Sequence, residues 1–310
     1  SKVDPKGFML ITERLALGLV PDIFRNHPVF LCIDDTLVEK YGRKFDGVGK
    51  LHDHSAHGGE SYVNGHCFVS VMLRVPVLAG KRLSYAAFPL GHFMWRGDAG
   101  RTKLEMAAGL VRDLMPALSG QRNVVLLCDS WYAKSEVLSL VGEYANLDVV
   151  CGARLDTVMY DLPPEEGAVG TPRRRGRPRK HGARVYAKGF PVTGFKVRGR
   201  KACARRVLTN ILPGIPVTAY VTESSNGERR LFLSTLSHTD IEFFHHMSDR
   251  REIARLGSAG AAYLPLMLYD FRWGIEVGYY EQKEFWDMCS YMVRKAAGID
   301  RKSTRLNSSH

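Results

Sequence analysis

The chain has 310 residues, of which 45% are hydrophobic and 25% charged, a composition that is typical of a globular protein and argues against wholesale disorder. Its length predicts about two domains, or one large domain with an insertion. No apolar run approaches the roughly 18 residues of a membrane-spanning helix, so a membrane protein is excluded. The first residues, SKVDPKGFML, contain no signal-peptide core. The six cysteines form no Cys-x-x-Cys pair, which favours reduced thiols over a disulfide framework or a structural zinc site.

The first half of the chain alternates between apolar strands and helices. Strands are predicted at residues 30–35, 62–79, 82–90, 124–130 and 147–155. Helices are predicted at residues 102–118, behind Thr102 as N-cap, and at 132–145. This layout predicts a mixed α/β fold with a central sheet.

The second half differs in composition. Residues 156–235 are rich in Pro, Gly and Arg and then show strand-like segments such as VTAYVTES, which indicates an inserted, mainly β subdomain. Residues 239–256 and 262–289 are predicted to be helical. The final DRKSTRLNSSH matches the translation of a sequencing adapter, which favours a processing scar over a genuine polar tail.

We therefore expect a chain that is truncated at both ends. Its expected segments are an N-terminal remnant (1–27), the first part of the core (28–155), a basic, mainly β insertion (156–237), the helical end of the core (238–299) and the foreign tail (300–310).

Positive charge is concentrated in one stretch. Residues 171–207 hold 14 Lys and Arg and no Asp or Glu, while the net charge of the whole chain is +12, so the rest is about neutral (12 − 14 = −2). Such density predicts a polyanionic partner, and nucleic acid is the obvious one. Within it, Arg175, Arg177, Arg179 and Lys180 resemble an AT-hook core that could enter a narrow minor groove. The alternative is a solvated basic loop that touches only phosphates.

Two predicted strands end in carboxylates. Asp34 and Asp35 follow one apolar run and Asp129 follows another. Two such ends that lie adjacent in a sheet predict a divalent-metal site with oxygen ligands. Strand alternation puts Asp34 and Asp35 on opposite faces, and both faces are apolar, so the residues alone do not choose between them.

A second polar cluster lies on a predicted helix. At about 100° per residue, Tyr269, Arg272, Glu276 and Lys283 fall within an arc of roughly 60°. An exposed helix with i,i+4 ion pairs is the alternative, since Arg272 and Glu276 have that spacing. The neighbouring residues are largely apolar, which favours a buried helix whose polar stripe faces a site.

Together these motifs resemble one enzyme family. The pattern Tyr-x2-Arg-x3-Glu-x6-Lys, the IDDT at 33–36 and the strand VVLLCDSWYA at 124–133 are similar to those of DDE transposases of bacterial insertion sequences with the Y-R-E-K signature. The resemblance covers residues 28–289. It implies an RNase H-like mixed sheet flanked by helices, with a mainly β insertion before the last catalytic helix.

The resemblance also implies roles for single residues and for partners. Asp35, Asp129 and Glu276 would be the metal-binding catalytic triad, since the family's first Asp directly precedes Thr. Tyr269, Arg272 and Lys283 would contact DNA phosphates. The implied cofactor is Mg²⁺, in two copies, with Mn²⁺ as a substitute. The implied partners are the duplex DNA of transposon ends and targets and a second copy of the full-length protein, in the nucleoid of a bacterial cytoplasm.

Other functions remain open at this stage. The chain could be a DNA-binding relic that cannot catalyse, or another RNase H-fold nuclease such as a junction resolvase. A metallohydrolase that uses His52, His54 and His57, or His245 and His246, is a further alternative. No HExxH motif or cysteine partner supports that last possibility.

Overall fold

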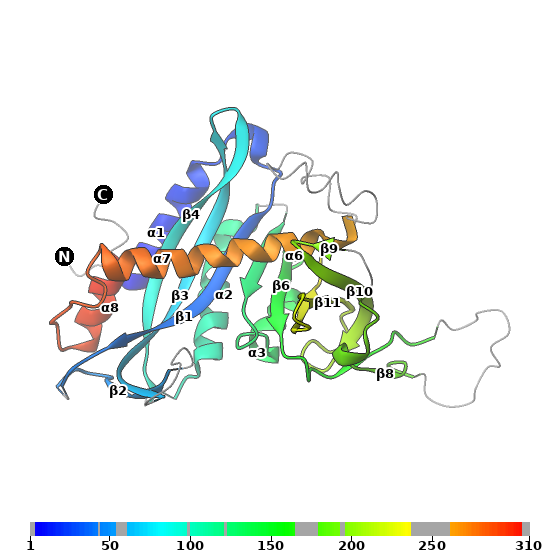
Figure 1. Cartoon of the computed structure of the whole chain (residues 1–310). Coiled ribbons are helices and arrows are strands. Elements are labelled where there is room, and N and C mark those ends of the chain that lie inside the picture. Colours follow the sequence, from blue (N-terminus) through cyan, green and yellow to red (C-terminus); the bar gives the residue numbers. More distant parts are fainter. Residues whose placement is uncertain are drawn as a thin grey trace.

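The structure is a computed structural model that describes residues 4–42, 44–53, 61–97, 100–120, 123–164, 179–192, 196–236 and 261–305. Within these residues, twelve strands form one mixed sheet, and helices pack on both of its faces (Figure 1). The expected fold class, a mixed α/β sheet flanked by helices, is confirmed. None of the described helices has the length and apolarity needed to cross a membrane.

Five strands form the core of the sheet, in the order β4-β3-β1-β5-β6. They are β1 (Val29–Glu39), β3 (Tyr62–Ala79), β4 (Arg82–Trp95), β5 (Val124–Cys128) and β6 (Leu147–Ala153). β3 runs antiparallel to β1 and β4, whereas β5 and β6 run parallel to β1, so the core sheet is mixed. The short β2 (Gly49–His52) pairs with β3.

β1 is longer than its apolar run predicts. The strand continues to Glu39, so Asp34 and Asp35 lie inside it and not at its end. The reason is that the whole second half of β1 stays paired with β3, from Asp34 opposite Ser70 to Glu39 opposite Gly65.

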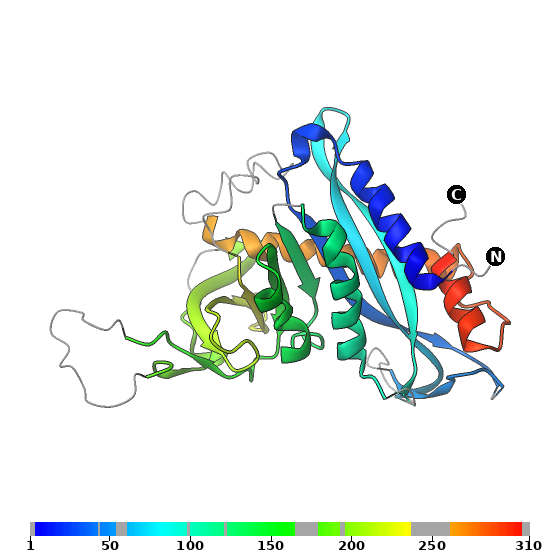
Figure 2. The ribbon, with the colours of Figure 1, turned by 180° about the vertical axis from the view of Figure 1, so that it is seen from behind.

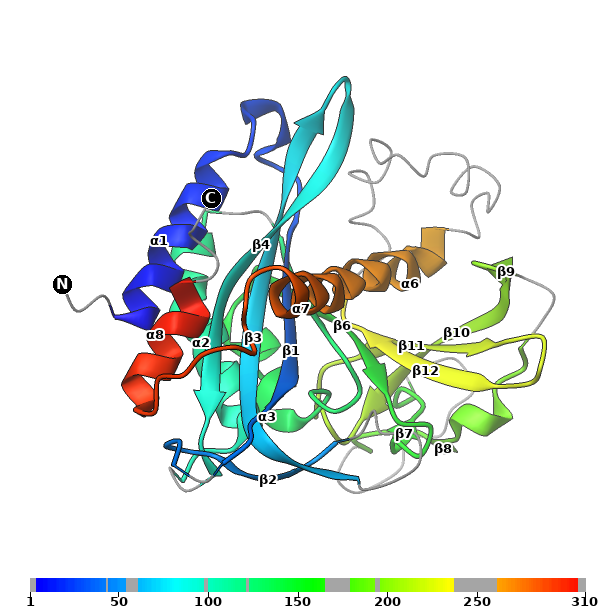
Figure 3. The same ribbon diagram turned by 60° about the vertical axis from the view of Figure 1, so that its left-hand side comes forward.

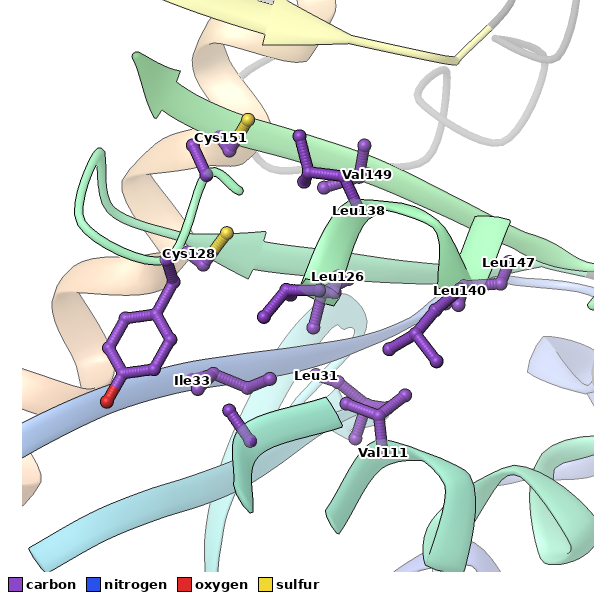
Figure 4. Close-up of a cluster of buried hydrophobic side chains, with 14 of the residues drawn as sticks. Leu31, Ile33, Val111, Leu126, Cys128, Leu138, Leu140, Leu147, Val149 and Cys151 are labelled. Carbon is purple, nitrogen blue, oxygen red and sulfur yellow. The ribbon is translucent and has the colours of Figure 1, made fainter. Parts of the chain in front are cut away.

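One face of the core sheet is covered by the N-terminal helices (Figure 2). They are α1 (Pro5–Gly18), α2 (Lys103–Leu118), α3 (Ser135–Leu138) and α4 (Leu140–Glu143). Thr102 caps α2 as predicted, in a capping box with Glu105. The single helix expected at 132–145 is two short helices that adjoin at Ser139. Figure 4 shows Leu31 and Ile33 of β1 packed on this side with residues of β5, β6 and the helices.

β1 is apolar on both faces because both faces are covered. Leu31 and Ile33 belong to the core beneath α2, whereas Phe30 and Cys32 belong to a second core beneath the C-terminal helices. Successive side chains of β1 point to opposite faces and both faces are buried, so the strand reads as an unbroken apolar run in the sequence.

The insertion before the C-terminal helices is mainly β, as predicted. Its elements are β7 (Met159–Tyr160), β8 (Arg184–Val185), η3 (Ala187–Gly189), β9 (Lys196–Val197), β10 (Arg200–Thr209), β11 (Val217–Glu223) and β12 (Arg229–Ser234). β12 pairs antiparallel with β6, so the insertion extends the core sheet instead of forming a separate one.

The C-terminal helices cross the second face of the sheet (Figure 3). A short turn η5 (Ala261–Tyr263) leads into α6 (Leu264–Tyr269), the 3₁₀ turn η6 (Asp270–Arg272) and α7 (Trp273–Glu284). The helix predicted at 239–256 lies outside the described residues.

The adapter-like tail begins within a helix. α8 (Ala296–Arg305) packs on β4 and α1, with Ile299 and Ser303 buried. The Asp300 carboxylate accepts the backbone N–H of Met94 at 2.8 Å. Residues 300–305 of this tail therefore belong to a packed helix. Residues 306–310 are not among the described ones.

Candidate active site

Two aspartates lie side by side on neighbouring parallel strands. The register of β1 and β5 pairs Ile33 with Cys128, so the residues that follow, Asp34 and Asp129, are neighbours. Both share the face of Cys32 and Leu127, which lies beneath α6 and α7. Burial and the negative charge of Asp129 raise the pKa of the Asp34 carboxyl to about 7. This pair of carboxylates therefore lacks full charge compensation.

A turn fixes the Asp129 carboxylate. Its Oδ1 accepts the backbone N–H of Trp131 at 2.9 Å and that of Tyr132 at 3.1 Å. An aspartate that bonds the amides two and three residues ahead is typical of an Asx turn. The second oxygen keeps its capacity to accept a donor or bind a cation.

Arg272 joins the C-terminal helix to β1. Its Nη1 donates to Asp34 Oδ2 at 3.0 Å, and its Nη2 donates to Glu276 Oε1. Burial opposes the charge of Arg272, but Tyr269, Asp34 and Glu276 outweigh it and raise the pKa of the guanidinium above its usual value. One partly buried cation therefore lies between the carboxylates of Asp34 and Glu276.

The helical segment can approach the sheet because glycines face it. A Cβ at Gly274 would lie 3.0 Å from Arg74 Nη1, and one at Gly278 would lie 2.9 Å from Met72 Cε. Arg74 uses the space to donate from Nη1 to the backbone oxygen of Phe271 at 2.9 Å. This hydrogen bond holds the 3₁₀ turn η6 against β3.

Tyr269 approaches the end of β5. A Cβ at Gly152 would lie 3.1 Å from Tyr269 Oη and 3.3 Å from the nitrogen of Ser130, so glycine leaves room for this phenol. Burial raises the pKa of Tyr269 above its usual range, so the phenol keeps its proton. The guanidinium of Arg272 lies 5.6 Å from the centre of its ring. The structure brings Tyr269, Arg272 and Glu276 together.

Asp35 lies elsewhere. Its Oδ2 accepts Lys103 Nζ at 2.7 Å and Cys67 Sγ at 3.1 Å, and its Oδ1 accepts the Tyr132 phenol at 3.0 Å. These partners lie on the side of the sheet that α2 covers. The structure therefore pairs Asp34, and not the expected Asp35, with Arg272 and Glu276. The reason is strand alternation, together with the face on which α7 packs.

Lys283 is the member of the predicted stripe that lies apart. Its Nζ donates to the backbone oxygen of Leu37 at 3.0 Å, and burial lowers the pKa of its ammonium. The side chain is therefore engaged by β1, two residues beyond Asp35.

The basic stretch is only partly described. Arg179 and Lys180 are exposed, whereas Arg175 and Arg177 lie outside the described residues. Other members have carboxylate partners, since Arg205 contacts Asp161 at 2.6 Å and Arg198 contacts Asp270 at 3.1 Å. Carboxylates from outside the stretch thus offset part of its charge.

The structure adds no support for a metallohydrolase site built from the histidines. The ring of His52 contacts that of Tyr62, with 5.1 Å between centroids. His54, His57, His245 and His246 lie outside the described residues.

The donor chemistry of this face fits a divalent cation. Asp34 and Asp129 offer carboxylate oxygens, which Mg²⁺ prefers, and burial together with the charge of Asp129 raises the pKa of Asp34. Among the described residues, no three His, Cys, Asp or Glu side chains already converge as a metal cluster. Asp34 and Asp129 would hold the cation, and Glu276 is separated from them by one guanidinium.

Two important residues were missed by the sequence analysis. Arg74 was detectable as a lone charge within an apolar strand, which calls for a buried partner. Tyr132 carried no signal of its own, because its partner Asp35 is 97 residues away in the sequence.

Comparison with known proteins gives matches to a family model and to solved structures. Residues 96–202 match the family model described as DDE superfamily endonuclease, a segment that includes Asp129 but neither Asp34 nor Glu276. The chain is also similar to a solved structure described as a cryo-EM structure of the piggyBac transposase synaptic complex with hairpin DNA, with 14% identity and a TM-score of 0.44. That match covers 91% of this chain and 47% of the other, so the chain spans about half the length of that protein. No curated protein matches.

Proposed function

We propose that the chain is the catalytic part of a DNA transposase, which cleaves and joins DNA strands in a metal-dependent reaction. The observation that supports this proposal most is that Asp34 lies beside Asp129 and shares Arg272 with Glu276 on one face of the sheet. The match of residues 96–202 to DDE superfamily endonucleases agrees with it. The geometry favours Asp34 over Asp35 as the first carboxylate.

The chemistry suits phosphodiester cleavage. Bound divalent ions, Mg²⁺ or Mn²⁺, would activate the attacking oxygen and stabilise the leaving one, and a two-ion site is typical of such reactions. Asp34, Asp129 and Glu276 would hold the ions. Arg272 carries a fixed positive charge beside them, so it can contact a DNA phosphate and offset charge in the transition state. Tyr269 remains a neutral hydrogen-bond donor at the same site.

The proposed substrate is duplex DNA, both as transposon ends and as target. The exposed Arg179 and Lys180 would add affinity by neutralising phosphates without choosing a sequence. A homodimer on DNA and a bacterial insertion-sequence origin are further parts of this proposal. Lys283 has a weaker claim to a phosphate contact, since it already donates to Leu37.

The test is nicking of supercoiled plasmid DNA by the purified chain with Mg²⁺ or Mn²⁺. We expect Asp34→Asn, Asp129→Asn and Glu276→Gln each to lower the rate by at least about 1000-fold, since each removes a charge that holds a metal ion. These amides are nearly isosteric, so the fold should survive. Asp113→Asn is the matched control, because Asp113 forms an exposed ion pair with Lys6 and should be neutral.

The outcomes separate the possible functions. Metal-dependent nicking that is lost in the three variants and kept in the control supports the transposase proposal. DNA binding without nicking would identify an inactive DNA-binding relic. Nicking that survives in all three variants would contradict the carboxylate assignment.

A further inference from the structure

Asp35 is fully engaged by protein donors. Its two oxygens accept an ammonium, a thiol and a phenol, from Lys103, Cys67 and Tyr132 at 2.7, 3.1 and 3.0 Å. All three donors come from other elements or loops of the fold. The carboxylate is therefore a junction that ties β1 to α2, β3 and the segment after β5.

Tyr132 connects this junction to the candidate active site. Its side chain is completely buried, and its phenol donates to Asp35. The backbone N–H of the same residue donates to Asp129 Oδ1 at 3.1 Å. One residue thus holds Asp35 with its side chain and Asp129 with its main chain.

Trp131 reinforces the connection. Its backbone N–H donates to the same Asp129 oxygen at 2.9 Å, and Lys103 Nζ lies 5.1 Å from the centre of its ring. Lys103 is itself paired with Asp35. Both residues of the turn that orients Asp129 therefore contact the Asp35 junction.

We propose that Asp35 is a positioning residue, which holds Tyr132 and so fixes the turn that orients the Asp129 carboxylate beside Asp34. This inference rests on the proposed function, in which Asp129 is a metal ligand. It gives the two adjacent aspartates of β1 separate roles. Asp34 faces the metal site, and Asp35 supports it from the opposite side of the sheet.

The proposal makes the role of the acceptor, and not of the charge, decisive. Asparagine at position 35 loses the ion pair with Lys103 but keeps an oxygen that can accept the Tyr132 phenol, so Asp35→Asn should retain the hydrogen bond that holds the turn. Asp35→Ala removes the acceptor, and Tyr132→Phe removes the donor while keeping the ring. A metal ligand at position 35 would behave differently, because Asp35→Asn would remove the charge that binds the ion.

The first measurement is the affinity for Mn²⁺, from the electron paramagnetic resonance of free Mn²⁺ in titrations without DNA. Supporting groups around a metal ligand typically contribute 10–100-fold to affinity, so we expect about that loss in Tyr132→Phe and in Asp35→Ala. Asp35→Asn should stay within about threefold of the wild type, as the conservative variant that restores the acceptor. Asp34→Asn should abolish binding.

The second measurement needs no metal. Amide hydrogen exchange of the peptide that spans residues 129–134 should accelerate by about tenfold or more in Tyr132→Phe, because the amides of Trp131 and Tyr132 lose their fixed acceptor. The peptide that spans residues 110–118 of α2 should be unchanged and serves as the internal control. If Asp35→Ala fails to fold, Tyr132→Phe alone decides the question.

The results distinguish this inference from the proposed function. If the wild type binds no Mn²⁺, the proposed metal site fails, while faster exchange at 129–134 in Tyr132→Phe would still support the positioning contact. If the wild type binds Mn²⁺ and Asp35→Asn loses binding as Asp34→Asn does, Asp35 is a ligand and the inference is overturned. Unchanged affinity and exchange in Tyr132→Phe would overturn it as well.

Discussion

Replacing Arg272 should strengthen metal binding while it weakens DNA binding. The guanidinium bridges Asp34 and Glu276, so it already compensates part of the negative charge that a divalent ion would use. Arg272→Gln removes this cation and keeps much of the side chain's volume. We therefore expect tighter Mn²⁺ binding in the variant, together with a loss of affinity for plasmid DNA.

The size of the effect follows from the distance. Arg272 Nη1 lies 3.0 Å from Asp34 Oδ2, so an ion held by the same carboxylate would lie roughly 5 Å from the guanidinium charge. Two positive charges at that separation repel by about 3 kcal/mol at an effective dielectric constant of about 20. The Glu276 side chain is 32% exposed, so solvent screens part of this repulsion. We expect roughly 1–2 kcal/mol, or about a 5–30-fold decrease in the Kd for Mn²⁺.

The assay is a Mn²⁺ titration of the wild type and of Arg272→Gln without DNA. Arg198→Gln is the matched control, because it removes a charge that pairs with Asp270 of the same turn on the surface, where both side chains are about half exposed. The control should change the Kd less than about twofold. A Kd that is unchanged or larger in Arg272→Gln would refute the view that Arg272 is the resident counter-ion of these carboxylates.

Two further predictions concern stability and DNA contact. Glu13 is completely buried, and burial raises its pKa from 4.5 to about 8, so the folded protein keeps a proton that the unfolded chain loses. The free energy of unfolding should therefore fall as pH rises from about 4.5 to about 8, by at most about 1.4 kcal/mol per pH unit. Urea titrations of Glu13→Gln should lack this contribution to the pH dependence. The same dependence of the unfolding free energy on pH in both proteins would contradict the prediction. Alanine at the four AT-hook-like positions should weaken the binding of duplex DNA. It should also reduce the slope of log K against log salt concentration by about 0.9 for each phosphate that is no longer neutralised. An unchanged slope would locate the DNA-binding surface elsewhere. Those positions are Arg175, Arg177, Arg179 and Lys180.

Much of the fold was accessible from the sequence because its signals are local. The apolar runs of β3, β5 and β6, the capping box of α2 and the strand-like segments of the insertion each depend on neighbouring residues. The pairing of β12 with β6 was not accessible, because it joins segments about 80 residues apart and no short-range pattern specifies it. The extent of β1 was missed for the same reason, since β3 keeps its polar half paired.

In the candidate site, too, the sequence predicted the features that depend on neighbouring residues and missed those that depend on distant ones. The spacing of Tyr269, Arg272, Glu276 and Lys283 predicted one helical face, because helical periodicity is local. The structure brings the first three together across α6, η6 and α7, whereas Lys283 contacts β1. The choice between Asp34 and Asp35 needed the position of α7, which depends on glycines at 274 and 278 that let the helix approach β3. With apolar residues on both faces of β1, alternation alone could not tell which face carries the site.

The most direct test of the proposed metal site is an anomalous difference map from crystals of this chain grown with MnCl₂. We predict a Mn²⁺ peak within coordination distance of the carboxylates of Asp34 and Asp129, on the face that α7 covers, with Asp35 still bonded to Tyr132. A peak bound by Asp35, or a map in which the ion contacts neither Asp34 nor Asp129, would contradict the assignment.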